Sequence, residues 1–305
     1  MTILVTGGSG LIGRRLIPSL EQWGHRVLRL VRSRDLAGDR AVYWSTSEGG
    51  FEWDEPGSID VVVHLAGESI LGRWTGAKKT RIRDSRVDPT RKLSAFLAGM
   101  ATPPSVLVCA SATGYYGHRG DEPLGEASPP GEGFLPEVSR QWEAATEAAR
   151  DAGIRVVNLR IGMVLTPEGG ALAAMRTPFR LALGGKVGEG RQYMSWITRD
   201  DLVSVIRYVL ESDVLAGPVN AVSPQPVTNA EFTRTLGRVL HRPTPFSVPA
   251  FAVRLLFGQM GSDLLLSSAR VEPQRLLEAG FQFEHADLEA ALNDLLKKQP
   301  SNPAQ

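Results

Sequence analysis

The chain has 305 residues, of which 42% are hydrophobic and 22% are charged, the proportions of an ordinary globular protein. Its 34 lysines and arginines against 33 aspartates and glutamates leave a net charge of +1, which disfavours nucleic acid or a membrane surface as a partner. No apolar run approaches the roughly 20 residues that span a bilayer, no signal peptide precedes the first apolar stretch, and the single cysteine cannot form an intrachain disulfide, so a cytoplasmic protein is expected.

The chain opens with the pattern strand, glycine-rich turn, helix. An apolar run at Ile3–Val5 predicts a buried strand, Thr6–Gly10 breaks it, and a helical pattern follows over Leu11–Trp23. Gly7 permits a tight turn, Gly10 lets backbone N–H groups approach a pyrophosphate, and Gly13 lets the helix pack closely. This spacing predicts a dinucleotide site, with Ser9, Leu11 and Ile12 as further contacts.

Strands and helices then alternate, which is typical of a parallel sheet covered on both faces. Further strands are predicted at Val27–Val31, Ala41–Trp44, Ile59–Leu65, Ser105–Ala110, Arg155–Leu159 and Pro218–Val222, and further helices at Ala77–Gly99, Pro136–Ala152 and Asp200–Ser212. A capping box at Thr228–Glu231 begins another helix. We predict an α/β protein with a Rossmann-type doubly wound sheet in residues 1–245, with substrate-side insertions from about residue 165. The segment Pro243–Pro249 is interpreted as a linker to a small, mainly helical domain at 246–298.

The residues after the second strand indicate which nicotinamide cofactor binds. An NAD enzyme places an acid near this point, whereas this chain has Arg32 and Ser33 and no acid before Asp35. Arg32 could pair with the 2′-phosphate of NADP(H), and Ser33 could add a contact, so NADP(H) is favoured. The alternative is that Arg32 and Arg34 are solvated surface charges.

The turn Leu65-Ala66-Gly67-Glu68 follows the strand Ile59–Leu65 and is predicted to form the second wall of the cofactor site. Glu68 is well placed for a ribose or sugar hydroxyl. His64 lies inside the strand and is interpreted as a hydrogen-bonded core histidine rather than a catalytic one, and Cys109 as a small buried hydrophobe rather than a nucleophile.

Several segments resemble the extended short-chain dehydrogenases, which include sugar-nucleotide epimerases: Asp60–Gly67, Ser111–Gly117 and Trp196–Leu202. Ala66–Glu68, Arg81–Arg86 and Val222–Phe232 more narrowly resemble the atypical "epimerase family" of NADP-dependent oxidoreductases, and Arg270–Arg275 resembles its appended C-terminal domain. The resemblance implies a Rossmann-type fold, NADP(H) and a small-molecule substrate. It also implies cofactor contacts at Arg32, Leu65, Ala66, Glu68, Arg86 and Val164, and the superfamily analogy suggests a homodimer through the helices 77–99 and 136–152.

The proton-transfer pair of the superfamily is missing. No tyrosine precedes a lysine by four residues anywhere in the chain, and aligning the third helix with the family pattern puts Leu135 at the tyrosine and Ser139 at the lysine. Three replacements are open. Tyr115 or Tyr116 could donate the proton, aided by Arg119 or Arg140; Ser111 or Thr113 could hydrogen-bond a substrate oxygen; or water could deliver the proton. The tyrosines could instead serve only as aromatic packing.

The sequence contains no cluster of His, Cys, Asp or Glu at metal-ligand spacing, so no metal is expected. Two functions fit the pattern. One is an NADP(H)-dependent oxidoreductase or redox epimerase acting on a small carbonyl or alcohol; the other is a non-catalytic NADP(H)-binding regulatory protein, which the missing pair favours. An apolar substrate pocket is predicted from Arg160–Met163, Met175, Phe179, Gln192, Tyr193, Met194 and Trp196, although the same side chains suit a plain core.

Overall fold

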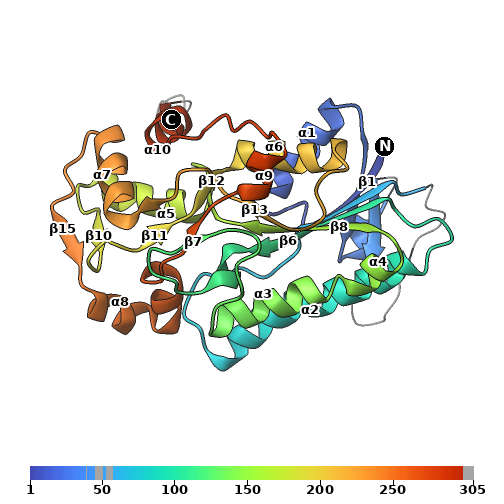
Figure 1. The fold of residues 1–305 in the computed structure, drawn as a ribbon, viewed down its shortest axis with the longest axis horizontal. Helices are drawn as coiled ribbons and strands as arrows, with labels where there is room; N and C mark the ends of the chain where they lie inside the picture. Colours follow the sequence, from blue (N-terminus) through green and yellow to red (C-terminus); the bar gives the residue numbers. More distant parts are fainter. Residues whose placement is uncertain (39, 45–50, 53–57, 298–305) are drawn as a thin grey trace.

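A computed structural model describes residues 1–38, 40–44, 51–52 and 58–297, and its centre is an eight-stranded sheet (Figure 1). The strand order is β13-β8-β6-β5-β1-β2-β3-β4, and all neighbours are parallel except β3 and β4. The bounds are β1 Thr2–Thr6, β2 Arg26–Val31, β3 Ala41–Trp44, β4 Phe51–Glu52, β5 Val61–His64, β6 Val106–Ala112, β8 Arg155–Ile161 and β13 Gly217–Ala221. Because the order runs outward from β1 in both directions, the predicted doubly wound fold is confirmed.

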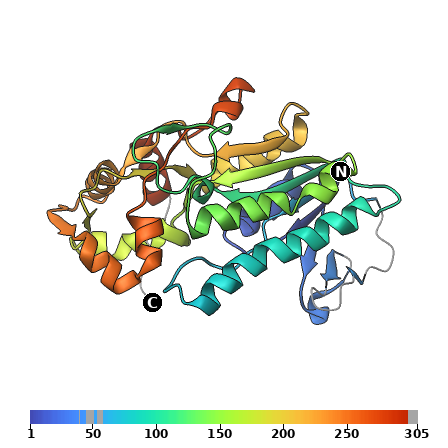
Figure 2. The same ribbon diagram turned by 60° about the horizontal axis from the view of Figure 1, so that its bottom comes forward.

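Helices cover both faces of this sheet (Figures 1 and 2). On one face lie α1 (Gly13–Gln22), α6 (Arg199–Glu211) and α9 (Gln274–Glu278), whose apolar residues share a core with β1, β5, β6, β8 and β13. On the other lie α2 (Gly76–Ala98), α3 (Phe134–Ala144) and α4 (Glu147–Asp151). Two separate cores therefore hold the sheet, and its side chains alternate between them.

The helix predicted over Pro136–Ala152 is in fact two helices, α3 and α4. Between them the backbone amide of Thr146 donates to the carbonyl of Glu143, three residues earlier (3.2 Å), and the buried Thr146 hydroxyl donates to the same oxygen (2.6 Å). The predicted apolar stripe is nevertheless correct, because Val138, Trp142, Ala145 and Ala149 are all buried. The face of a helix follows from spacing, whereas this break goes with the local hydrogen bonds of one residue.

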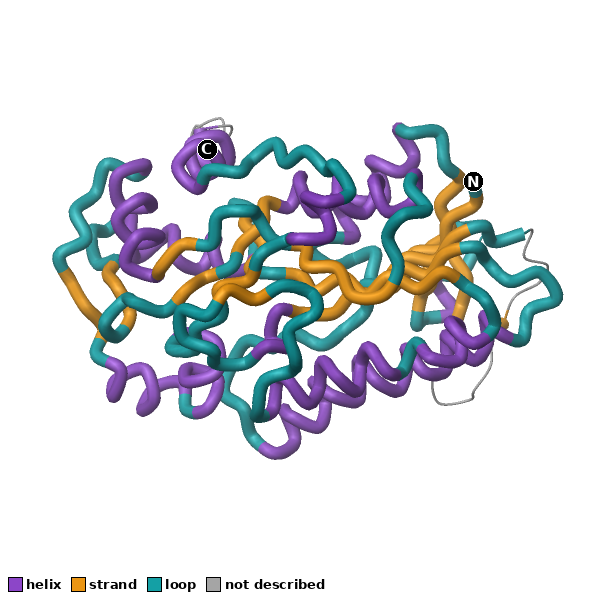
Figure 3. Tube along the Cα trace, viewed as in Figure 1, coloured by secondary structure: helices purple, strands orange, loops and turns teal. Residues whose placement is uncertain are grey.

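The later part of the chain forms a third core. Its helices and short strands lie beyond the carboxyl end of the sheet, where Figure 1 labels them and Figure 3 shows the same region as a mixture of helices, short strands and loops. This core contains α5 (Gly170–Arg180), α7 (Asn229–Val239) and α10 (Leu288–Lys297). The chain outside the central sheet also forms four pairs of short strands: β9 Met163–Leu165 with β12 Trp196–Thr198, β10 Gly185–Val187 with β15 Phe246–Val248, β11 Tyr193–Met194 with β14 Val227–Thr228, and β7 Pro123–Leu124 with β16 Arg270–Val271. The last pair contributes Leu124 and Val271 to a separate small cluster with Tyr116. The predicted linker Pro243–Pro249 thus contains a strand, and α8 (Ala250–Phe257) follows it.

Several residues that the sequence suggested for a substrate pocket are part of this third core. Phe179 and Trp196 are buried, and Trp196 donates its indole N–H to the carbonyl of Gln225 (3.0 Å). Met163, Met175 and Met194 pack against the same cluster. The core interpretation therefore holds for these five residues. No helix among the described residues has the length and apolar character needed to cross a bilayer.

Candidate functional site

The glycine turn after β1 is built so that no side chain fits at two of its positions. Gly7 has a φ of +70°, and a Cβ there would lie 2.7 Å from the carbonyl carbon of Leu65 at the end of β5. A Cβ on Gly13, the first residue of α1, would lie 2.5 Å from the carbonyl oxygen of Gly7. The amide of Gly10 donates to that same oxygen (2.9 Å) and closes the turn. The result is a bare backbone cradle at a helix N-terminus, which suits a diphosphate.

The turn Leu65–Glu68, which follows β5, lies directly beside this cradle, and Arg86 of α2 holds it by hydrogen bonds. Its Nη2 donates to the carbonyl of Glu68 (2.9 Å), its Nη1 donates to that of Ile82 (3.0 Å), and its guanidinium lies 5.1 Å from the centre of the Trp142 ring. Burial lowers the pKa of Arg86 to about 10. The resemblance implies that Arg86 contacts the cofactor. In the structure its guanidinium is bonded to the backbone of the turn and fixes the shape of the turn.

Glu68, the last residue of this turn, carries a negative charge. Its Oε1 accepts a hydrogen bond from Nζ of Lys78 (2.7 Å), which holds the pKa of the Glu68 carboxyl below its usual value. The ionised Glu68 therefore offers a carboxylate oxygen at the rim for a hydroxyl group.

The remaining predicted cofactor residues lie around the same edge. Leu11 approaches the loop before α5, since a Cβ on Gly170 would lie 3.3 Å from its Cδ2 and 3.8 Å from the carbonyl oxygen of Val164. Ser9 is exposed, and Ile12 packs on the core of the α1 face. Arg32 is exposed just beyond β2, where it makes no hydrogen bond or ion pair with the described residues, and Ser33 beside it is half-buried. The glycine turn, Arg32 with Ser33, and Leu65–Glu68 thus follow the carboxyl ends of the neighbouring strands β1, β2 and β5, whereas Arg86 comes from α2 and Val164 from β9.

His64 is a buried, hydrogen-bonded core histidine, as the sequence analysis suggested, and it links the end of β1 to α2. Its Nδ1 accepts from the Thr6 hydroxyl (2.7 Å) and its Nε2 donates to Thr90 Oγ1 (2.9 Å). This tautomer follows because the Thr90 hydroxyl donates to the carbonyl of Arg86 (2.6 Å), and Trp142 also donates to that oxygen (3.0 Å). Burial lowers the pKa of His64 to about 4, so the ring is neutral.

Two of the four proposed catalytic side chains point into the protein. Ser111 is 3% exposed and donates to Oε1 of Glu143 (2.7 Å). Tyr116 is fully buried, its hydroxyl donates to Oδ1 of Asn220 (2.7 Å), and burial raises its pKa. Both hydroxyls are occupied by internal hydrogen bonds, which argues against either one touching a substrate.

The other two, Thr113 and Tyr115, are half-buried in the short helical turn Thr113–Tyr116 that follows β6. Neither hydroxyl makes a hydrogen bond with the described residues. The Tyr115 ring stacks on the guanidinium of Arg160, 3.5 Å from its centre, and meets Tyr116 edge-on. These are the hydroxyls at the end of β6 that remain free for a ligand.

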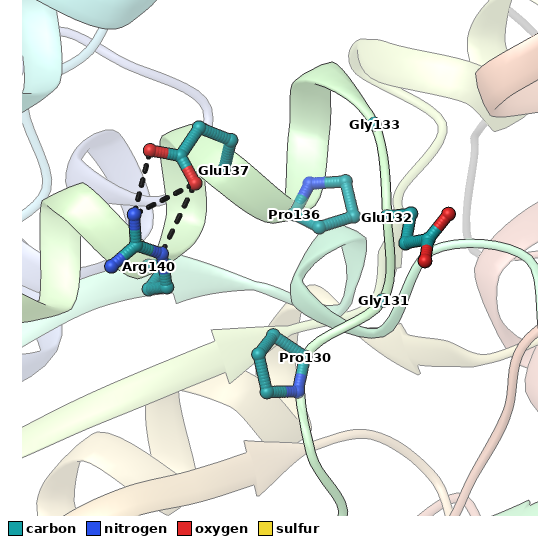
Figure 4. A pocket seen from close by; sticks show the side chains of 7 residues that line it. All are labelled: Pro130, Gly131, Glu132, Gly133, Pro136, Glu137 and Arg140. Atoms are coloured by element: carbon teal, nitrogen blue, oxygen red, sulfur yellow. Dashed lines mark hydrogen bonds and ion pairs between the residues drawn. The ribbon is translucent and has the colours of Figure 1, made fainter.

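The cation beside Tyr115 is Arg160 of β8, and neither arginine suggested from the sequence contacts the tyrosine rings. Arg119 forms a forked pair with Glu122 (2.9 and 2.7 Å). Arg140 is held by Glu137 (2.8 Å) in a surface cavity of about 330 Å³, lined by Pro130, Gly131, Glu132, Gly133, Pro136, Glu137 and Arg140 (Figure 4). The sequence analysis named Arg160 only as part of the predicted pocket lining, and its contact with Tyr115 was not predicted.

The position of the family tyrosine is apolar. Leu135 packs against the turn Thr113–Tyr116, since a Cβ on Gly114 would lie 3.3 Å from its Cβ, and Ser139 is buried. Leu135 belongs to a cluster with Trp74, Phe134 and, from the C-terminal segment, Met260 and Leu264. No group of three His, Cys, Asp or Glu side chains in the described part of the chain could hold a metal ion.

A doubly wound sheet with a bare glycine cradle at its carboxyl edge defines a dinucleotide-binding protein of the Rossmann type. The chain belongs to the NAD-dependent epimerase/dehydratase family, whose model matches residues 3–221. Residues 248–295 match a second family, described as a domain of unknown function, DUF1731.

The relatives share nearly the whole length. The epimerase family protein Mb2239 of Mycobacterium bovis is 44% identical over 95% of this chain and 96% of its own, and YfhF of Bacillus subtilis is 37% identical over 97% and 98%. The crystal structure of the human epimerase family protein SDR39U1 with NADPH superposes with a TM-score of 0.90 at 33% identity, covering 98% of this chain and 100% of that one. The resemblance inferred from the motifs is therefore confirmed.

Proposed function

We propose that the protein is an NADP(H)-dependent oxidoreductase or redox epimerase that acts on a small carbonyl or alcohol. One observation carries the proposal: the glycine cradle, the Glu68 wall and the free hydroxyls of Thr113 and Tyr115 all follow the carboxyl ends of neighbouring strands. The human relative solved with NADPH supports the choice of cofactor.

Each residue has a separate task in this proposal. The backbone of Gly7–Gly13 holds the diphosphate, and Arg32 pairs with the 2′-phosphate by charge-assisted hydrogen bonds. When bound, NADPH would supply the hydride that reduces a carbonyl carbon. Thr113 donates a hydrogen bond to the carbonyl oxygen, and the Tyr115 hydroxyl gives its proton to that oxygen; water then returns a proton to the tyrosine.

The alternative is a binding protein that holds NADP(H) without turnover. The specific observation in its favour is the apolar packing of Leu135 and the burial of Ser139, where the superfamily carries its tyrosine and lysine. Under this alternative, Tyr115 packs over the cofactor and transfers no proton.

Two measurements separate these functions. Calorimetric titration with NADPH and NADH tests the cofactor: Arg32→Glu should weaken NADPH binding about tenfold or more while leaving NADH nearly unchanged. Equal losses for both nucleotides would remove the 2′-phosphate assignment.

NADPH oxidation with benzaldehyde, diacetyl and 9,10-phenanthrenequinone tests turnover. Tyr115→Phe and Thr113→Ala should each slow it by about a hundredfold, the usual contribution of a positioned proton donor, while Ser111→Ala should change it far less. NADPH binding without turnover on any of the three probes would favour the regulatory alternative.

A further inference from the structure

A buried guanidinium lies beneath the proposed proton donor. Arg160 of β8 is 3% exposed, and its planar group stacks on the Tyr115 ring at 3.5 Å. Arginine is almost never buried unless its charge is paired, so this placement requires a partner. The stacking also joins two strand ends, because Arg160 comes from β8 and Tyr115 follows β6.

Glu143 of α3 is that partner, and it fixes the plane of the guanidinium. Nε of Arg160 donates to Oε1 (2.8 Å) and Nη2 donates to Oε2 (2.9 Å), a two-point contact. The remaining Nη1 donates to the Tyr116 hydroxyl (2.9 Å) and to the carbonyl of Glu126 (3.2 Å). Although burial opposes the charge, the hydrogen bonds and charge of Glu143 raise the pKa of Arg160. Every nitrogen of the group is thus anchored.

Tyr115 is held by its ring and its backbone, while its hydroxyl is left free. The ring contacts Arg160 and also packs at a steep angle to the ring of Tyr116, whose centre is 5.3 Å away, and the carbonyl of Tyr115 accepts from the amide of Gly131 (3.0 Å). The hydroxyl makes no hydrogen bond with the described residues. A free hydroxyl on a fixed ring is the arrangement that a proton donor needs, because small displacements slow transfer steeply.

We propose that Arg160, oriented by Glu143, is the positioning residue that aims Tyr115 at the substrate. The inference rests on the proposed function, in which Tyr115 donates the proton. In this chain a cation from β8 lies against the donor ring, whereas the superfamily pattern has a lysine four residues along the same helix. A lysine at position 160 would keep the charge but lose the planar stack and the two-point contact.

The position of the ring can be measured without any turnover. With 3-fluorotyrosine placed at residue 115, the wild-type protein should give one ¹⁹F resonance displaced from that of the free amino acid. In Arg160→Lys the resonance should move towards the free value and broaden. Arg119→Lys disrupts a comparable forked pair that does not touch Tyr115, and it should leave the resonance in place.

A double-mutant cycle tests whether Arg160 acts through Tyr115. In NADPH oxidation with 9,10-phenanthrenequinone, Arg160→Lys should lower kcat about tenfold or more, with the KM for NADPH unchanged. In a Tyr115→Phe background the same change should have little further effect. A purely structural role would instead add to the loss in both backgrounds and raise the KM.

The outcomes separate the two proposals. An unmoved ¹⁹F resonance in folded Arg160→Lys, or additive losses in the cycle, would overturn the positioning role. Wild-type turnover in Tyr115→Phe would remove Tyr115 as the proton donor and would overturn the positioning role, while leaving the oxidoreductase activity itself in place. Absence of turnover in the wild-type protein on all three carbonyl probes would instead overturn the proposed function and leave the ¹⁹F measurement of the ring position valid. If Arg160→Lys does not fold, Glu143→Gln decides, because it keeps the shape of the partner and removes its charge. The resonance should then shift in the same direction, and no shift would refute the proposal.

Discussion

The buried His64, which is hydrogen-bonded to Thr6 of β1 and Thr90 of α2, makes a testable contribution to the pH dependence of stability. Its ring is neutral in the folded protein, since burial lowers its pKa from 6.5 to about 4. In the unfolded chain the imidazole takes up a proton near pH 6.5. Between these two pH values the unfolded state therefore binds more protons than the folded state, and stability rises with pH.

The size of the effect follows from the two pKa values. At about 1.4 kcal/mol for each pH unit between 6.5 and about 4, His64 should remove roughly 3 kcal/mol of stability as the pH falls through that range. Above pH 6.5 its contribution is complete, and below pH 4 no further loss is expected from this group. Three kcal/mol is a large fraction of the stability of a typical domain.

The assay compares wild type with His64→Gln, which offers hydrogen-bonding atoms to Thr6 and Thr90 but does not titrate. The free energy of unfolding is measured in urea at steps from about pH 7.5 to about pH 4.5. All other titrating groups are shared, so the difference between the two proteins isolates His64. Wild type should lose most of the roughly 3 kcal/mol relative to the variant. A difference that stays constant across the range would refute the buried, neutral histidine.

Two further predictions concern the cradle and the later part of the chain. Gly13→Ala should weaken NADPH binding about tenfold or more by calorimetry, because its Cβ would lie 2.5 Å from the carbonyl oxygen of Gly7, whereas Gly76→Ala, with open space around its Cβ, should bind normally. Thr228→Ala should lower the free energy of urea unfolding by about 1 kcal/mol, because the capping box that Thr228 forms with Glu231 begins α7; an unchanged midpoint would contradict this.

Local spacing was enough to predict much of the architecture. The glycines at 7, 10 and 13 predicted the cradle because each lies within one strand–turn–helix unit, and the alternation of strands and helices predicted the doubly wound sheet. His64 could be assigned to the core because its strand is apolar on both faces. The helix break at Thr146 and the strand inside Pro243–Pro249 were not predicted, because each depends on a particular hydrogen-bond partner.

The chemistry at the end of β6 was decided by the tertiary structure. Ser111 and Tyr116 carry the same kinds of hydroxyl group as Thr113 and Tyr115, an aliphatic alcohol and a phenol, yet the first two hydroxyls are turned inward to Glu143 and Asn220. Arg160 follows Tyr115 by 45 positions and reaches its ring only because β8 pairs with β6. The sequence determines which side chains each helix or strand carries. Which of those side chains come into contact depends on how the strands pair and the helices pack, and residue spacing along the chain does not reveal those contacts.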